Sequence, residues 1–280
     1  MSRSKLVLSL VALLALSQTA AAGTIDDIRD RGAIRIGVRQ DAKPFSYYNE
    51  VGEPVGYTVE LCRAVAVHLK KALDLPGLKL DYVKVTTEDR FDAVKEGRID
   101  LLCGATTITF SRREQVSFSS PIYITGAGLL FRADGPQSLG ELDGKKIGVR
   151  SGTTTEQSLI DMIERLAVNT EIVRFADHQL ALEALAADTI SAYFADRAIL
   201  AELMKSPPSD KIRLSDVVLS VEPYGLALRR GDEDFRLAVD RALAQIFRSN
   251  ELTKIYRGTF GNRPPGPFLE AIYLQGALSE

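Results

Sequence analysis

The chain has 280 residues, of which 35 are basic and 37 acidic, and it contains only two cysteines and two histidines. A formal net charge of −2 argues against nucleic acid as a partner. The few cysteines and histidines exclude a disulfide-rich scaffold, a four-cysteine metal site and a histidine-rich metal site, so we expect no metal and no cofactor.

The first 22 residues have the pattern of a secretory signal peptide. Arg3 and Lys5 precede the apolar run 6–16, and three alanines end the segment before Gly23. The run is shorter than the roughly 18 apolar residues that a membrane anchor needs. We therefore expect cleavage after Ala22 and an exported mature protein with a net charge of 33 − 37 = −4, since two of the 35 basic residues lie in the segment.

Strand-like and helix-like runs alternate from residue 33 onward, which is typical of the βαβ units of an α/β fold. Val59, Cys62 and Leu69 recur on one face of the first helix. The second helix starts at a capping-box pattern, Thr86 with Asp89. The predicted elements are strands 33–38, 79–85 and 101–103 and helices 59–73 and 88–95.

The alternation restarts after residue 139 as a second α/β unit. The last strand, 224–228, and helix 234–248 lack a partner sheet of their own, so we place them in the first unit. The chain would then cross twice between two lobes, near 124–128 and 219–224, and two such crossings make a hinge. We predict lobe 1 from residues 23–125 and 222–280 and lobe 2 from 126–221. The elements predicted in lobe 2 are strands 146–149, 171–175 and 191–195 and helices 155–166, 178–186 and 197–205.

A carboxylate site is predicted where strand 101–103 ends. A small-residue loop, 104–107, follows the strand, and Arg112 comes next. Ligands of open α/β sheets lie beyond the carboxyl ends of the strands, and an arginine pairs bidentately with a carboxylate. Arg39 and Arg90 lie at the ends of two other strands. We therefore expect an anion site with a charge near +3, more than one α-carboxylate neutralises.

The second lobe offers further binding groups. Thr153 and Thr154 lie at a helix amino terminus, where free amides favour an anion, and His178 begins another helix. Asp196 by itself is most simply a helix N-cap, but opposite the arginines it would bind an ammonium group. If Arg112 binds an α-carboxylate, Arg39 and Arg90 still require a second anion, which points to glutamate or aspartate.

The sequence resembles the periplasmic amino-acid-binding proteins of ATP-binding-cassette importers, and within them the glutamate/aspartate-binding branch. The matching segments are 39–47, 56–61, 87–90, 104–107, 107–112, 118–123, 151–154 and 177–178. The resemblance implies a type II periplasmic binding protein fold of class α/β, with two lobes and a two-strand hinge. It implies a non-enzymatic protein that closes on an acidic amino acid and presents it to a membrane permease.

The resemblance also implies a role for each site residue. The ligand's distal carboxylate is assigned to Arg39, Thr87, Arg90 and His178, and its α-carboxylate to Thr107, Arg112 and Thr153. Asp196 takes the ammonium group, and Thr154 adjoins Thr153. Ala105 stands where this branch commonly has serine, so only its backbone carbonyl can serve.

Several alternatives stay open at this point. Cyclohexadienyl (prephenate) dehydratases resemble this fold, although such an enzyme needs a general acid and no amine clamp. No residue excludes a soluble sensor. The sequence does not rank glutamate against aspartate, nor does it decide whether glutamine or asparagine is admitted. We expect a monomer.

The two cysteines, Cys62 and Cys103, are both predicted in lobe 1. Export makes a disulfide chemically possible. We nevertheless expect two free buried thiols, because helix-to-sheet spacing often exceeds the Cα separation of ~7 Å that a disulfide tolerates.

Overall fold

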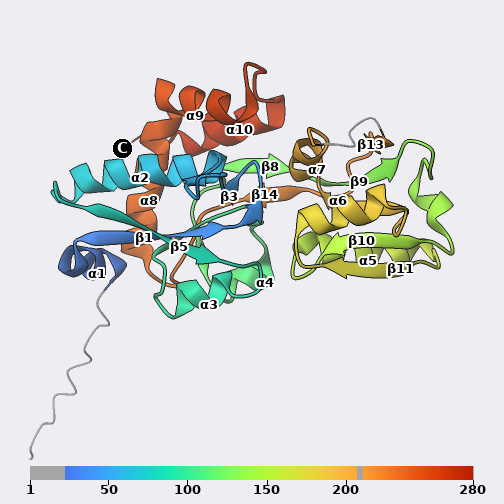
Figure 1. Cartoon of the computed structure of the whole chain (residues 1–280). Coiled ribbons are helices and arrows are strands. Elements are labelled where there is room, and N and C mark those ends of the chain that lie inside the picture. The colour runs from blue at the N-terminus through green and yellow to red at the C-terminus, as the bar shows by residue number, and fades with distance from the viewer. Residues whose placement is uncertain (1–22, 207–210, 280) are drawn as a thin grey trace, which may run out of the picture.

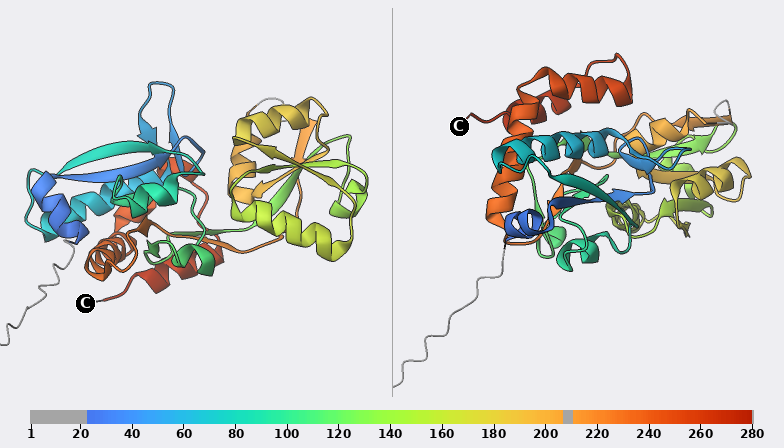
Figure 2. Two further views of the ribbon diagram at one scale, coloured as in Figure 1. Left: turned by 90° about the horizontal axis from the view of Figure 1, so that it is seen from below. Right: turned by 60° about the vertical axis from the view of Figure 1, so that its left-hand side comes forward.

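The computed structural model describes residues 23–206 and 211–279 (Figure 1). The predicted signal peptide lies outside these residues. The chain forms two α/β units, for which we keep the names lobe 1 and lobe 2, and two extended segments connect them (Figure 2). No helix in the described ranges combines the length and the hydropathy needed to cross a bilayer.

Lobe 1 is built on a five-stranded sheet with the order β5-β1-β6-β15-β7. The strands β1, β5 and β6 are parallel, and β15 and β7 complete the sheet with antiparallel pairs. The strands are β1 (Ala33–Arg39), β5 (Lys79–Val85), β6 (Leu101–Cys103), β7 (Ser117–Phe118) and β15 (Ala227–Leu228), with a separate small sheet of β2 (Asp41–Ala42), β3 (Ser46–Tyr48) and β4 (Pro54–Val55). The helices are α1 (Thr24–Arg31), α2 (Tyr57–Ala72), α3 (Arg90–Lys95), α4 (Phe110–Arg113), α8 (Glu233–Phe247), α9 (Asn250–Phe260) and α10 (Pro267–Gly276).

Alternation along the strands places an apolar core on each face of this sheet. Ile34, Ile36 and Val38 of β1 are fully buried in the larger core, which also contains the apolar faces of α2 and α8. A smaller core that includes Val94 and Leu102 involves α3. The sheet is therefore buried on both faces, as expected for strands joined by crossover helices.

Lobe 2 has the sheet order β11-β10-β12-β9-β13. Strands β10, β11 and β12 are parallel, whereas β9 and β13 are antiparallel additions. The elements are β9 (Ala127–Arg132), the 3₁₀ helix η1 (Leu139–Leu142), β10 (Lys146–Arg150), α5 (Thr154–Leu166), β11 (Glu171–Phe175), α6 (His178–Ala186), β12 (Ala192–Asp196), α7 (Arg197–Leu203) and β13 (Ile212–Leu214).

The two connecting strands pair with each other. Strand β8 (Tyr123–Thr125) runs antiparallel to β14 (Glu222–Tyr224), with Tyr123 opposite Tyr224. The continuous strand predicted at 224–228 is wrong, because the chain divides there into β14 in the connection and β15 in the sheet of lobe 1. The predicted lobe boundaries, 125/126 and 221/222, fall at the ends of this strand pair.

An aromatic cluster supports the connection from the side of lobe 1. Phe45 is fully buried, with ring-centroid distances of 4.8 Å to Tyr123 and 5.1 Å to Tyr224. The Tyr57 hydroxyl donates a hydrogen bond to the Ile122 carbonyl at 2.9 Å. Phe45 therefore packs beneath the hinge strands, and its role is in packing.

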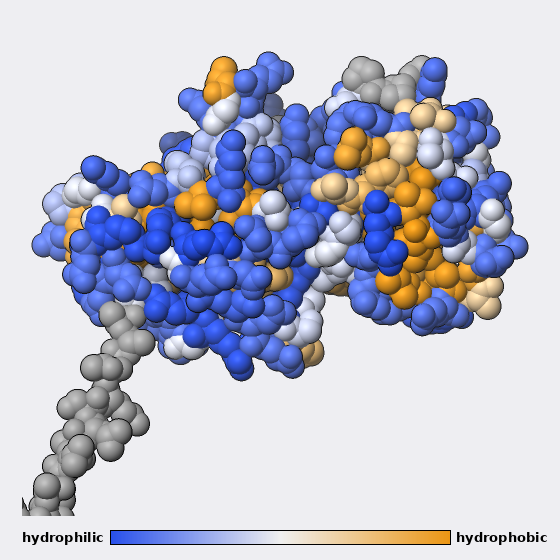
Figure 3. All heavy atoms as spheres, turned by 60° about the horizontal axis from the view of Figure 1, so that its bottom comes forward, coloured by the Kyte–Doolittle hydropathy of each residue, from blue (hydrophilic) through white to orange (hydrophobic). Residues whose placement is uncertain are grey.

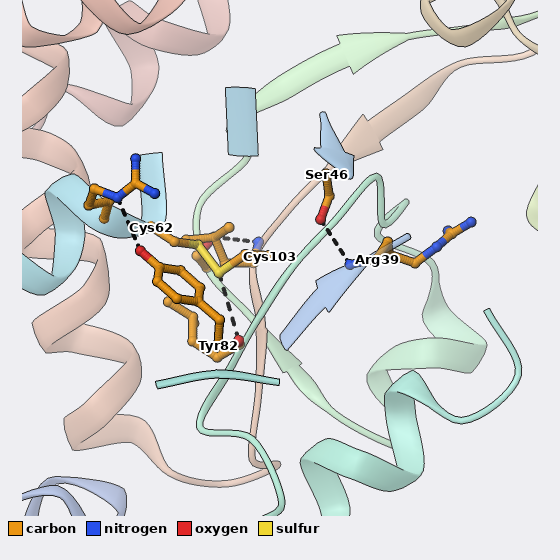
Figure 4. Close-up of a disulfide and its surroundings, with 9 residues drawn as sticks. Arg39, Ser46, Cys62, Tyr82 and Cys103 are labelled. Atoms are coloured by element: carbon orange, nitrogen blue, oxygen red, sulfur yellow. Dashed lines mark hydrogen bonds between the residues drawn. A yellow bond between two sulfur atoms is a disulfide. The ribbon is translucent and has the colours of Figure 1, made fainter. Parts of the chain in front are cut away.

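The two cysteines form a disulfide, so the expectation of free thiols is wrong. Cys62 lies on the buried face of α2, and Cys103 is the last residue of β6 (Figure 4). Their Cα atoms are 6.3 Å apart, because α2 packs closely enough on the sheet at this point to satisfy the geometric limit. The bond joins α2 to the strand that leads into the loop 104–107.

Replacing both cysteines, as Cys62→Ser with Cys103→Ser, is expected to lower the free energy of unfolding by about 4 kcal/mol. The disulfide closes a loop of 41 residues, and the loop-entropy relation gives this magnitude. Urea unfolding of the wild type and the double variant measures it. Reductant should destabilise the wild type and leave the double variant unchanged; two reactive thiols in unreduced, unfolded wild type would contradict the bond.

Candidate ligand-binding site between the lobes

The three predicted arginines are brought together where the two lobes meet. Arg39 ends β1, Arg90 begins α3 and Arg112 lies in α4, and all three side chains are buried. Burial lowers the pKa of Arg90 to about 8, and the neighbouring Arg39 and Arg112 add to the effect. The strand-end rule therefore placed these cations correctly in one neighbourhood.

A carboxylate neutralises one of these three charges, that of Arg39, so the predicted site charge near +3 is wrong. Asp41 accepts hydrogen bonds from Arg39 at 2.9 Å (Nε) and 2.5 Å (Nη2). Arg90 instead donates to the carbonyls of Thr87 and Gly152, the latter at 3.3 Å. Its Nε is buried and has no hydrogen-bond partner among the described residues. Arg112 donates to the Thr107 carbonyl at 2.8 Å. Within residues 23–206 and 211–279, neither Arg90 nor Arg112 forms an ion pair with a carboxylate.

Asp196 faces the arginines from lobe 2. It ends β12 and occupies the N-cap position of α7, but its side chain makes no capping hydrogen bond, so the simple capping interpretation does not hold. Its Oδ1 is buried and forms no well-aligned hydrogen bond within the described residues, although the Tyr224 hydroxyl lies close enough to lower the pKa of the carboxyl group. Burial raises the pKa of Asp196 to about 7, and the nearby Glu222 carboxylate adds to this rise.

Glu222 is a site residue that the sequence analysis missed. It lies in β14, is buried, and accepts hydrogen bonds from Thr154 at 2.9 Å and from Ser220 at 2.8 Å. Burial lowers the pKa of Arg112, although the Glu222 and Asp196 carboxylates oppose this effect. The signal in the sequence was an acidic residue inside the predicted crossing 219–224.

Some threonine hydroxyls of the site already form hydrogen bonds, whereas others have no partner within the described residues. The Thr153 hydroxyl caps α5 by accepting from the Glu156 N–H at 3.1 Å, and it also donates to the Arg150 carbonyl at 2.7 Å. Its backbone N–H is thus the group left for an anion. The hydroxyl oxygens of Thr107 and Thr154 are 3.2 Å apart across the lobes. The Thr87 and Thr106 hydroxyls are buried and have no partner in the described ranges, and Ala105 is half-buried.

His178 begins α6 and is buried. Its Nδ1 lies 2.5 Å from the Tyr193 hydroxyl. Burial lowers the pKa of His178 to about 3, although the nearby Asp41 carboxylate opposes this effect. The imidazole is therefore neutral at physiological pH and can offer a hydrogen bond but no charge.

Two solvent-connected pockets flank these buried groups, and residues of both lobes line each of them. One, of about 1080 Å³, is lined by Asp41, Glu88, Arg150 and His178 among others. The other, of about 490 Å³, is lined by residues that include Thr107, Arg112, Thr154 and Glu222. In the space-filling view of Figure 3, the two lobes are in contact, with mainly hydrophilic residues on the side of lobe 1 and more apolar residues on the side of lobe 2.

Comparison with known proteins identifies the family. The model of the bacterial extracellular solute-binding proteins, family 3, matches residues 34–262. The chain belongs to this family. The glutamate/aspartate import solute-binding protein of Escherichia coli is 32% identical over 88% of this chain and 82% of its own length. The L-glutamate/L-aspartate-binding protein of Pseudomonas aeruginosa is 34% identical, over 84% and 78% respectively.

The solved structures agree with this assignment. An ancestral arginine-binding protein bound to glutamine superposes with a TM-score of 0.73 at 29% identity, over 83% of this chain and 99% of that one. The two-lobe periplasmic binding protein fold is thus confirmed, and this family 3 protein is an amino-acid solute-binding protein, not an enzyme. The ligands named for these relatives are acidic in two cases and not in the third.

Proposed function

We propose that this family 3 protein captures an acidic L-amino acid, glutamate or aspartate, between its lobes. The lobes, residues 23–125 with 222–280 and residues 126–221, close around the ligand. After removal of residues 1–22, the protein acts as a periplasmic monomer. It delivers the ligand to the permease of an ATP-binding-cassette importer.

The α-amino and α-carboxylate groups of the ligand fit the pair formed by Asp196 and Arg112. Arg112 has a buried guanidinium whose only hydrogen bond in the described chain goes to a backbone carbonyl. Its remaining N–H groups can therefore donate to both oxygens of a carboxylate. Asp196 offers an ammonium group a buried carboxylate oxygen that forms no well-aligned hydrogen bond in the described part of the chain. Thr107 lies beside Arg112, and Thr153 can contribute its backbone N–H.

The distal carboxylate fits Arg90 and Thr87. Both present buried donors, Arg90 Nε and the Thr87 hydroxyl, for which the part of the chain that the structure describes supplies no partner. Arg39 and His178 lie on the same side, but Arg39 shares its charge with Asp41 and His178 is neutral. Arg90 is therefore the cation on which selection for a charged ligand side chain depends.

The observation that carries the proposal is the set of unpartnered polar atoms at this junction. Leaving a buried polar group unpaired costs about 1–3 kcal/mol. A zwitterion with a second carboxylate supplies acceptors to the arginine and threonines and donors to the aspartate. Among the described residues, these atoms are Arg90 Nε, Thr87 Oγ1, Thr106 Oγ1 and Asp196 Oδ1, the last of which has only the Tyr224 hydroxyl nearby.

Calorimetry of ligand-stripped protein with each of the twenty amino acids tests this function. We expect glutamate and aspartate to bind most tightly, because only they place a negatively charged side-chain carboxylate beside Arg90. Tighter binding of a neutral or basic amino acid would refute acidic specificity, and the absence of any amino-acid binding would refute the whole proposal.

Arg90→Met is expected to weaken glutamate binding by about 30-fold or more and to change glutamine binding far less. Removing one partner of a buried charge pair costs about 2 kcal/mol or more of binding free energy. Glutamine has a neutral side-chain amide and forms no such pair, so its binding free energy should change far less. Arg98→Met is the matched control, because Arg98 lies just beyond α3 and makes only exposed ion pairs. Equal losses for glutamate and glutamine would contradict the distal assignment.

A further inference from the structure

Arg150 connects the two lobes through side-chain ion pairs. It ends β10 in lobe 2, the same position in its strand that Arg39 has in lobe 1, and its side chain is 4% exposed. Its Nε donates to Asp41 at 2.9 Å, and its Nη1 donates to Glu88 at 2.9 Å. Both acceptors belong to lobe 1. We call Arg150, Asp41 and Glu88 the interlobe clasp.

The clasp is fixed on the side of lobe 2 as well. Arg150 Nη1 also lies 3.0 Å from the Ser151 carbonyl and 3.0 Å from the Ser151 hydroxyl, so groups of its own lobe hold the guanidinium as well. A pre-oriented donor loses little side-chain entropy when it meets its acceptors.

Asp41 lies between two arginines of opposite lobes. Its Oδ1 accepts from Arg39 and its Oδ2 from Arg150. Burial opposes its ionisation, yet the Arg39 and Arg150 guanidinium groups hold the pKa of Asp41 well below its usual range. With Glu88 included, the cations Arg39 and Arg150 face the anions Asp41 and Glu88, so these four side chains together carry no net charge. The clasp needs no charge from a ligand to form.

We propose that Arg150 sets the affinity of this protein for every ligand alike, by stabilising the closed arrangement of the lobes through Asp41 and Glu88. The inference rests on the proposed function only for the choice of ligands. When binding requires a closed state, the apparent dissociation constant is the intrinsic one divided by the closed fraction. Arg150 changes that fraction, whereas Arg90 distinguishes between ligands.

Arg150→Gln tests the clasp, because it removes the charge and keeps most of the length. By calorimetry, the dissociation constants for glutamate and glutamine should rise by the same factor, roughly tenfold, with their ratio unchanged. In small-angle scattering, the ligand-free variant should have a larger radius of gyration than the ligand-free wild type. Glu88→Gln, at a 58% exposed side chain, should shift both measurements in the same direction by less.

The matched control is Arg174→Gln. Arg174 also lies in a strand of lobe 2 and also pairs with a glutamate, but its partner Glu156 belongs to the same lobe. This variant should leave both dissociation constants and the radius unchanged. Thermal unfolding of each variant shows whether it is folded before binding is measured.

Two outcomes would overturn the inference. Unchanged affinities together with an unchanged ligand-free radius in Arg150→Gln would show that the clasp does not stabilise closure. If only the affinity for glutamate fell, Arg150 would instead distinguish between ligands by the charge of their side chains. If wild-type protein bound no amino acid, the proposed function would fail, yet the ligand-free scattering of Arg150→Gln, Glu88→Gln and Arg174→Gln would still decide the clasp.

Discussion

Arg112→Met is expected to abolish binding of every amino-acid ligand in calorimetry. The α-carboxylate would enter the closed site without its cation, and an unpaired buried charge costs several kcal/mol. The affinity loss is then at least about 1000-fold and does not depend on the ligand's side chain. Glutamate, aspartate and glutamine should all be affected equally.

Arg113→Met is the control for this experiment. Arg113 follows Arg112 in α4 but is exposed, so the variant removes the same charge from the same helix without touching the site. It should bind like the wild type. Glutamate binding by Arg112→Met within a few-fold of the wild type would refute the α-carboxylate assignment.

Asp196→Asn is expected to weaken glutamate binding by about 100-fold or more and to spare glutarate, which lacks the amino group. The amide keeps the shape of the carboxyl group but no longer attracts an ammonium charge. Calorimetry with the two ligands measures the difference. Equal losses for both would mean that Asp196 positions the site and does not contact the ammonium group.

The same variant has an expected effect on stability that depends on pH. The native pKa of Asp196 is raised from 3.8 to about 7, so the native state binds the extra proton between these values and the wild type loses stability as the pH rises through them. Asparagine does not titrate. Ligand-free Asp196→Asn should therefore be more stable than the wild type above pH 7, by on the order of 4 kcal/mol.

Urea unfolding at several pH values tests this sign. The advantage of Asp196→Asn should shrink as the pH falls through this range and vanish below about pH 3, where Asp196 is protonated in both the native and the unfolded state. An advantage that is the same at pH 4 and pH 8, or a variant less stable than the wild type at pH 8, would contradict the raised pKa. The measurement needs no ligand, so it is independent of the proposed function.

The sequence by itself determined the local elements of this protein. Strands β5, β6 and β11 and helix α6 have the predicted bounds, because strand alternation, helical spacing and caps such as Asp177 act within a few residues. The order of strands and helices also predicted that Arg39, Arg90 and Arg112 gather at one edge of a sheet, since the carboxyl ends of parallel strands share an edge.

Only the tertiary structure decided which charges compensate one another. Asp41 and Arg150 are 109 residues apart in the chain, and Thr154 and Glu222 are 68 apart. No local pattern indicates that such groups meet, because their distance depends on how two lobes and a hinge pack. The disulfide also depends on tertiary packing. The Cα atoms of the two cysteines are 6.3 Å apart, below the ~7 Å limit, because of how closely α2 packs on β6, and short-range sequence preferences do not determine this distance.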